Sequence, residues 1–258
     1  MIQMEATVLR DGLTLRGFYD VPAGKPAFDC AIIFHGFTGN CGRQKKRIEY
    51  QAAQTLLNAG MAVARFDFNG HGKSDGRFED MTVLNELDDA RAILRFVRQQ
   101  PGVQRIMLVG MSQGGVVASM LAGYYHDAID QVVLMYPAAT LKDDAQHGEM
   151  QGLHYDPQQI PAVQVWHSDH GDFSVGDFYF RTAQTLPIYE VAKQYRGPVL
   201  LMHGDADPIV PRSASERYLS GYQHAEYHVI PGGDHGFHAP GARKEALRLL
   251  EEFVEKNK

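Results

Sequence analysis

The sequence has only two cysteines, Cys30 and Cys41, which cannot form a disulfide framework. No further cysteine completes the spacing of a zinc site, so we expect a reducing compartment and no structural metal. The chain also lacks any apolar stretch near the roughly 20 residues that a membrane helix requires. Its first residues show no basic segment followed by an apolar one, the pattern of a signal peptide. These absences predict a cytoplasmic protein with no membrane partner.

Positive charge is also scarce, since 25 Lys and Arg residues stand against 31 Asp and Glu residues, a net charge of −6 at pH 7. Phosphate binding needs a clustered positive field, so this balance argues against a nucleic-acid partner. One basic run, residues 43–47, is the exception, and we interpret it as a solvated face. The 258 residues, 44% of them hydrophobic, are typical of one globular domain with a sizeable core.

Hydrophobic patterning predicts strands that alternate with helices. Alternation at residues 13–19 indicates a half-exposed strand, and we expect residues 1–9 to pair with it as an antiparallel edge. Short apolar runs then alternate with amphipathic segments, which is typical of buried parallel strands and crossover helices. Strands are predicted at 30–34, 61–66, 105–109, 131–136, 199–202 and 227–230, and helices at 48–59, 83–98, 113–124, 213–219 and 243–254. This pattern predicts an α/β fold with a mostly parallel, doubly wound sheet.

One interval is too long for a single crossover. About sixty residues lie between Pro137 and the strand that begins at Val199, whereas a crossover needs only about a dozen. The interval contains many aromatic residues, which a disordered loop seldom holds: Tyr155, Trp166, Phe173, Phe178, Tyr179 and Phe180. We therefore predict that residues 137–190 form an inserted cap over one end of the sheet, and that residues 1–136 and 191–258 form the core.

Two segments match the pattern Gly-x-Ser-x-Gly, one centred on Ser74 and one on Ser112. Ser112 directly follows an apolar strand and enters a run with helical character. A strand-to-helix turn this sharp strains the serine backbone and tolerates only small neighbours, which explains Gly110 and Gly114. Ser74 lies in a Gly-rich loop with no helix pattern behind it, and we expect it to be a turn residue. Ser112 is therefore the predicted nucleophile.

A serine hydroxyl needs a base to remove its proton and a carboxylate to orient that base. His235 lies in the loop PGGDHGF after the final predicted strand, and His238 is the alternative base. The carboxylate is expected in HGDADPIVP, after the preceding strand, where Asp205 and Asp207 compete. Pro208 restricts the backbone of Asp207 towards the extended region, which favours a projecting carboxylate. We predict that Asp207 is the acid and that Asp205 belongs to a tight turn.

The negative charge of a tetrahedral intermediate needs two backbone N–H donors placed where it develops. Gln113, directly after Ser112, would supply the first donor. Phe37, in the loop HGFTG after an early strand, would supply the second, unless that loop is a plain glycine turn. No Gly-x-Gly-x-x-Gly spacing or Walker motif after a suitable strand supports nucleotide binding. We interpret residues 167–172, which include His and Asp, as a solvated loop, and expect no metal or cofactor.

The motifs HGFTG, RFDFNGHGKSDG, GMSQGG, HGDADPIVP and GGDHGF follow the order Ser, Asp, His and resemble the α/β-hydrolase superfamily over essentially the whole chain. More narrowly, HGFTGN, YPAATLK and FYFRTAQTLPIYEVA resemble the bacterial cinnamoyl or feruloyl esterases. This resemblance implies hydrolysis of hydroxycinnamic acid esters, with a cap that closes over the aromatic acyl group. It also implies that Asp144, Gln151 and Tyr179 contact the ring hydroxyl or cover the ligand.

These observations predict a serine carboxylesterase that acts on a small aromatic ester through an acyl-enzyme. An aromatic acid with a phenolic hydroxyl needs an apolar slot and one or two polar groups, and the cap segment offers both kinds of residue. The alternative is that the cap aromatics only form a small core of their own. A short-chain acyl esterase, a thioesterase or a monoacylglycerol lipase on the same fold is the rival function, and a non-catalytic binding module is a further alternative. We leave open whether the chain forms a homodimer.

Overall fold

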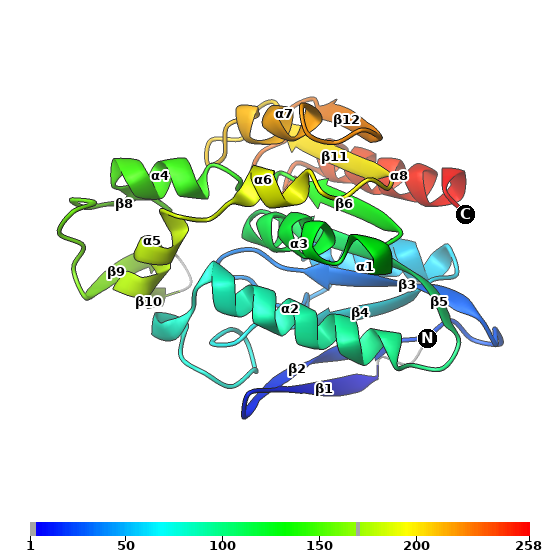
Figure 1. Cartoon of the computed structure of the whole chain (residues 1–258). Coiled ribbons are helices and arrows are strands. Elements are labelled where there is room, and N and C mark those ends of the chain that lie inside the picture. The colour runs from blue at the N-terminus through cyan, green and yellow to red at the C-terminus, as the bar shows by residue number, and fades with distance from the viewer. Residues whose placement is uncertain (1–3, 169–170) are drawn as a thin grey trace.

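The computed structural model describes residues 4–168 and 171–258. Within these residues a central sheet contains eight strands in the order β1-β2-β4-β3-β5-β6-β11-β12 (Figure 1). Strands β1 (Glu5–Arg10) and β2 (Leu13–Asp20) form an antiparallel hairpin at one edge, and β2 pairs antiparallel with β4 (Ala62–Phe66). The predicted antiparallel edge is therefore confirmed, except that its first three residues lie outside the described part of the chain.

All other strand pairings in this sheet are parallel. The strands concerned, besides β4, are β3 (Phe28–Phe34), β5 (Val103–Met111), β6 (Gln131–Met135), β11 (Val199–Gly204) and β12 (Ala225–Ile230). Every residue of β4, β6 and β11 is buried. Burial on both faces of the sheet explains why these segments are almost continuously apolar in the sequence.

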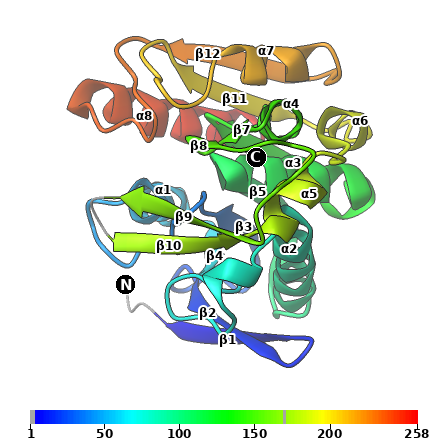
Figure 2. The same cartoon turned by 90° about the vertical axis from the view of Figure 1, so that its left-hand side faces the viewer.

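Helices cover both faces of the sheet, and Figure 2 separates α1 and α8 on one side from α2 and α3 on the other. Alternate residues of β3 serve the two faces, since Ile32 belongs to the core cluster with α2 and α3, and Ile33 to the cluster with α1 and α8. The core helices are α1 (Ile48–Asn58), η1 (Phe78–Asp80), α2 (Val83–Arg98), α3 (Gln113–Tyr124), η2 (His126–Ala128), α7 (Ser213–Leu219) and α8 (Pro240–Lys256).

Residues 137–190 leave the sheet after β6. Their elements are α4 (Leu141–His147), β7 (Glu149–Met150), β8 (Leu153–His154), β9 (Val163–Ser168), β10 (Gly171–Gly176), α5 (Asp177–Ala183) and the start of α6 (Ile188–Ala192). Two short antiparallel strand pairs, β7 with β8 and β9 with β10, lie with α4 and α5 beside one end of the sheet (Figures 1 and 2). The predicted boundary at residue 190 falls inside α6, which packs against α3.

Cap residues whose side chains are buried include Met150, Val175 and Phe180. All three belong to the main core cluster, so the cap packs onto the core of the sheet domain. The prediction of a solvated loop at 167–172 is only partly correct, because residues 167–168 end β9 and residues 171–172 begin β10. The His167 and Asp172 side chains are exposed and lie 2.8 Å apart, and residues 169–170 lie outside the described residues. Among the described residues, no helix combines the length and apolar character needed to cross a membrane.

Candidate active site

Ser112 lies at the sharp turn between the end of β5 and the start of α3. Its φ of 53° and ψ of −122° place it in a backbone region that residues with a side chain seldom adopt. Neighbouring glycines make room for this turn, since a Cβ on Gly110 would lie 2.3 Å from the Gly114 carbonyl oxygen. A Cβ on Gly36 would lie 2.8 Å from the Cβ of Ser112 itself. The local context is the strand, turn and helix that the sequence predicts.

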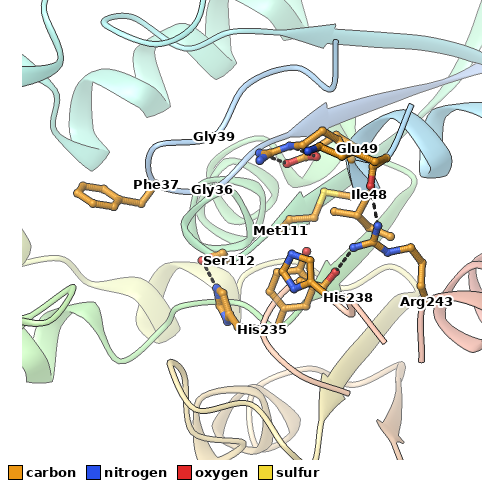
Figure 3. A pocket seen from close by; sticks show the side chains of 14 residues that line it. Gly36, Phe37, Gly39, Ile48, Glu49, Met111, Ser112, His235, His238 and Arg243 are labelled. Atoms are coloured by element: carbon orange, nitrogen blue, oxygen red, sulfur yellow. Dashed lines mark hydrogen bonds and ion pairs between the residues drawn. The ribbon is translucent and has the colours of Figure 1, made fainter. Parts of the chain in front are cut away.

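Three loops that follow β5, β11 and β12 bring Ser112, Asp207 and His235 together. The carboxyl ends of parallel strands meet at one edge of the sheet, so residues far apart in the sequence become neighbours there. His235 Nε2 lies 3.0 Å from Ser112 Oγ, and His235 Nδ1 lies 2.9 Å from Asp207 Oδ2 (Figure 3 shows the contact between Ser112 and His235). An imidazole held between a hydroxyl and a carboxylate can accept the hydroxyl proton in a fixed orientation.

Asp207 is fixed by contacts to both of its oxygens, and its side chain is only 1% exposed. Its Oδ1 accepts hydrogen bonds from the backbone N–H groups of Ile209 and Val210, at 2.8 and 3.0 Å. Its Oδ2 lies 3.3 Å from Nε2 of His203, a buried residue of β11 that is not among the sequence-predicted site residues. Burial opposes ionisation, but the hydrogen bonds from His203 and His235 outweigh it and hold the pKa of Asp207 well below its ordinary value.

The alternatives for each role make other contacts. Asp205 Oδ1 accepts a hydrogen bond of 2.6 Å from the Gly232 N–H, so this carboxylate holds the turn after β12. Ser74 Oγ donates to the Asp67 carbonyl oxygen at 2.6 Å, which agrees with the prediction of a turn residue. The side chain of His238 is 70% exposed, and its Nδ1 lies 3.2 Å from Oδ2 of Asp234.

The two predicted oxyanion donors flank Ser112. Gln113 is the first residue of α3, and the first N–H groups of a helix have no acceptor within it. Phe37 follows Gly36 in the loop after β3, and both line the same cavity as Ser112. The Gly39 N–H donates to the Gly36 carbonyl oxygen at 2.9 Å, which closes the turn around Phe37. These backbone positions suit the predicted donors.

A buried histidine holds the Phe37 loop against the sheet. His35 Nε2 accepts a hydrogen bond of 3.0 Å from the Phe68 N–H, and its Nδ1 lies 2.9 Å from the Gly36 carbonyl oxygen. An acceptor at Nε2 and a donor at Nδ1 define a neutral imidazole. Burial lowers the pKa of His35, which also favours the neutral form. The loop that carries one predicted oxyanion donor is therefore positioned by a side chain.

The interpretation of residues 43–47 as a solvated face is only partly correct. Arg43 Nη2 lies 2.9 Å from Oδ2 of the buried Asp67, and Arg47 Nη2 lies 3.2 Å from Oε1 of the buried Glu49. A buried carboxylate needs a partner, and each of these arginines supplies one. Residues 44–46 between them are exposed.

A buried series of hydrogen bonds joins the turn at Ser112, which we call the nucleophile turn, to the cap. Gln113 Nε2 donates to Glu86 Oε2 at 2.8 Å, and the Tyr179 hydroxyl donates to Gln113 Oε1 at 2.5 Å. Gln151 Nε2 donates to the Tyr179 hydroxyl at 3.3 Å. Glu86 and Gln113 are fully buried, and burial raises the pKa of Glu86 well above its ordinary value although the bond from Gln113 opposes this. Glu86 is not among the predicted site residues, because it lies within an amphipathic helix.

Two cavities lie near Ser112. The first, which we call the catalytic cavity, has a volume of about 400 Å³ and is lined by Ser112, His235, Phe37 and residues of the loop before α1. The second, the cap cavity, has a volume of about 500 Å³. Its lining comes from Ala138, Thr140, Leu141, Asp144, His147, Glu149, Gln151, Gly152, Trp166, Pro208, Ile209 and Val210. The Ala138 N–H donates to the Ser112 carbonyl oxygen at 3.0 Å, so the cap cavity begins beside the nucleophile turn.

The three predicted cap residues take different positions. Asp144 and Gln151 both line the cap cavity. Tyr179 is buried, and its ring stacks on Phe37 with centroids 5.4 Å apart. Trp166 meets Phe37 edge to face at 5.5 Å and donates from Nε1 to the Gln151 carbonyl oxygen at 2.7 Å. Within the described residues, no group of three or more His, Cys, Asp or Glu side chains is arranged to hold a metal ion.

Comparisons with known proteins agree with this fold. The family described as serine aminopeptidase, S33, matches residues 26–239. A structure of Est1E from Butyrivibrio proteoclasticus with ferulic acid bound has a TM-score of 0.91 and 31% identity, covering 98% of each chain. A monoacylglycerol lipase from Mycolicibacterium smegmatis is 24% identical over 228 residues, which cover 78% of this chain and 79% of the lipase. The predicted α/β-hydrolase fold and the likeness to feruloyl esterases are thus confirmed, and the chain belongs to the serine aminopeptidase S33 family of α/β hydrolases as an esterase.

Proposed function

We propose that the protein is a serine carboxylesterase that hydrolyses esters of hydroxycinnamic acids. The observation that carries this proposal is the hydrogen-bonded series from Ser112 Oγ through His235 to Asp207, with spacings of 3.0 and 2.9 Å. Each spacing lies within the range that proton transfer and tautomer control require. The series borders the catalytic cavity, so an ester carbonyl has room to approach the hydroxyl.

In the proposed reaction, Ser112 Oγ attacks the carbonyl carbon while His235 Nε2 takes its proton. The resulting oxyanion is held by the N–H groups of Phe37 and Gln113, and loss of one such donor typically costs about 2.7 to 4 kcal/mol of barrier. The intermediate then collapses, and His235 returns the proton to the leaving alcohol. Water repeats the same steps on the acyl-enzyme and releases the acid. Asp207 stays ionised throughout, in keeping with its depressed pKa.

The cap cavity supplies a place for an aromatic acyl group. Leu141 and Ile209 give it apolar walls, and Asp144 and Gln151 give it polar groups that a phenolic hydroxyl can meet. Asp144 is held by a hydrogen bond of 2.8 Å from the Thr140 hydroxyl. Burial raises the pKa of Asp144, with the Thr140 bond opposing this, as expected for a carboxyl that faces a partly apolar cavity. The ferulic acid bound to Est1E, a structure of 31% identity, supports this choice of acyl group.

Replacement of Ser112 tests the mechanism. Ser112→Ala removes the nucleophile, so kcat for methyl ferulate should fall by at least about 10⁴-fold. Ser74→Ala is the matched control, because Ser74 occupies the same sequence pattern but contacts backbone, and it should keep the parent rate. A fluorophosphonate probe should label the parent and not Ser112→Ala. Hydrolysis at the parent rate by Ser112→Ala would refute the assignment of Ser112 as nucleophile. If the fluorophosphonate probe did not label the parent, a non-catalytic binding module would be favoured.

A monoacylglycerol lipase is the second candidate, favoured by the 24% identical relative from Mycolicibacterium smegmatis. The two functions differ in the acyl group that the cap cavity must accept. Comparison of kcat/KM for methyl ferulate, methyl butyrate and a monoacylglycerol separates them, because all three esters have an unactivated alcohol as leaving group. Preference for methyl ferulate supports the proposal, and preference for either alkyl ester contradicts it. A cytoplasmic location, which rests on the scarcity of cysteine, and a small-molecule ester as partner remain part of the proposal.

A further inference from the structure

The catalytic cavity, and not the cap cavity, borders the base that must protonate the leaving alcohol. In the proposed reaction His235 Nε2 delivers a proton to the departing oxygen, so the alcohol has to lie on the His235 side of Ser112. Ser112 and His235 both line the catalytic cavity, and neither is among the residues that line the cap cavity. The acyl group and the alcohol are therefore divided between the two cavities.

Lysine and arginine side chains outnumber acidic ones in the wall of the catalytic cavity. These are Lys46, Arg47 and Arg243, and they stand against one acidic residue, Glu49. Arg47 is neutralised by its ion pair with Glu49 at 3.2 Å. Within the described residues, Lys46 and Arg243 form no ion pair with a carboxylate, so two positive charges remain unpaired beside the nucleophile.

Arg243 is held in place by backbone carbonyl groups and not by a carboxylate. It donates from Nε to the Phe237 carbonyl oxygen at 2.9 Å, from Nη1 to the Lys46 carbonyl oxygen at 2.6 Å and from Nη2 to the Gly236 carbonyl oxygen at 2.8 Å. Figure 3 shows this guanidinium on the far side of Ser112 from Phe37. A guanidinium has five N–H donors, so two of them remain for a ligand. The carbonyl bonds also attach Lys46 and the His235 loop to α8 around the same cation.

We propose that the catalytic cavity is a leaving-group subsite for an alcohol that carries a carboxylate. This inference rests on the proposed esterase function and names the second half of the substrate. Although the protein as a whole has a net charge of −6, two unpaired cations line this cavity of about 400 Å³ and contribute a positive field there. An anionic group on the alcohol gains from that field and from the fixed N–H donors of Arg243. A cavity of this volume accommodates a ring-sized alcohol.

Two ferulate esters that differ only in charge test the proposal. In one, ferulic acid is esterified to the hydroxyl of 4-hydroxycyclohexanecarboxylic acid, so the leaving alcohol carries a carboxylate. In the other, ferulic acid is esterified to the hydroxyl of the corresponding carboxamide, so the leaving alcohol is neutral. The parent should show a kcat/KM for the acid about five- to tenfold above that for the amide at low ionic strength, and 0.5 M NaCl should reduce this ratio by screening. The readout is the ratio, which cancels effects common to both esters.

Substitution of the exposed Lys46 locates the effect. Lys46→Gln should lower the acid-to-amide ratio by about threefold, and Lys46→Glu should lower it further. Lys45→Gln is the matched control, since Lys45 is adjacent and exposed but does not line the cavity, and it should leave the ratio unchanged. A parent ratio near one, or a ratio insensitive to Lys46, would overturn the subsite while ester hydrolysis persists. Failure to hydrolyse either ferulate ester would instead overturn the proposed function.

Discussion

The two oxygens of Asp207 have separate partners, and this division explains how one side chain fixes both a loop and the imidazole of His235. Oδ1 binds the N–H groups of the residues that follow it, so the carboxylate cannot rotate. Oδ2 is then directed at His235 and His203. The arrangement requires acceptors only, and an amide in the same place would present a donor to one of these partners.

Asp207→Asn should therefore lower kcat for ester hydrolysis by about 10⁴-fold, because the amide favours the wrong imidazole tautomer. Asp205→Asn, two residues away in the same motif, is the control and should keep most of the activity, since Asp205 serves the turn at Gly232. Steady-state rates with methyl ferulate and circular dichroism of both variants provide the measurement. A loss equal to that of Asp205→Asn would show that Asp207 does not orient the base.

At the scale of elements, helices α2, α3 and α5 are joined by one buried polar chain from Glu86 through Gln113 to Tyr179. An uncharged acid suits this site, because an ionised one would lie in a dry environment with a single donor. The Oε1 atom of Glu86 has no hydrogen-bond partner in the described part of the chain. The chain places the cap helix α5 directly against the residue that we propose as an oxyanion donor.

The stability of the Glu86→Gln variant relative to the parent should increase as pH rises. The pKa of Glu86 is raised in the folded protein, so the parent keeps its full stability below the unfolded pKa of about 4.3 and loses stability as pH increases towards the folded pKa. The glutamine variant has no such loss. Urea unfolding midpoints at pH 5 and pH 8 should show a difference, variant minus parent, that grows with pH. Glu251→Gln, an exposed position on α8, measures the effect of removing one charge, and an equal difference at both pH values would contradict the prediction.

The strands and the nucleophile turn could be predicted because their causes are local in the sequence. Ser112 stands between an apolar run and a helical run, with glycines where the turn is crowded. Glu86 and His203 could not be found in that way, since one looks like a polar position of an amphipathic helix and the other like part of an apolar strand. Their roles depend on Gln113 and Asp207, which reach them only in the folded chain. The seven-residue helices of the cap are likewise set by tertiary packing.

For the molecule as a whole, composition gives the net charge but not the location of each charge. The sequence indicates a basic run at residues 43–47, and only the fold shows that two of its arginines serve buried acids. Lys46 and Arg243 are 197 positions apart and yet share a hydrogen bond at the catalytic cavity. No spacing rule connects such positions, because α1 and α8 meet only when both have packed on the same face of the sheet.

The rate at which the two cysteines react with a thiol reagent measures how readily the folded protein opens. Cys30 lies in β3 and Cys41 in the segment between β3 and α1. Both are buried, and burial raises the pKa of each thiol. The native protein should therefore react with a thiol reagent far more slowly than the guanidinium-unfolded chain, in which both thiols are free. Mass spectrometry of the labelled protein gives the order of reaction. We expect Cys41 to react before Cys30, since a loop opens more easily than a central strand, and the reverse order would contradict this.

The catalytic cavity and the cap cavity have no lining residue in common. In the proposed mode of binding, preference for an acid and preference for an alcohol are thus encoded by separate sets of side chains around one reaction centre. Substitutions in sets that do not touch tend to combine additively. Directed evolution can therefore improve each half in its own small library and join the winners afterwards, instead of searching every combination at once.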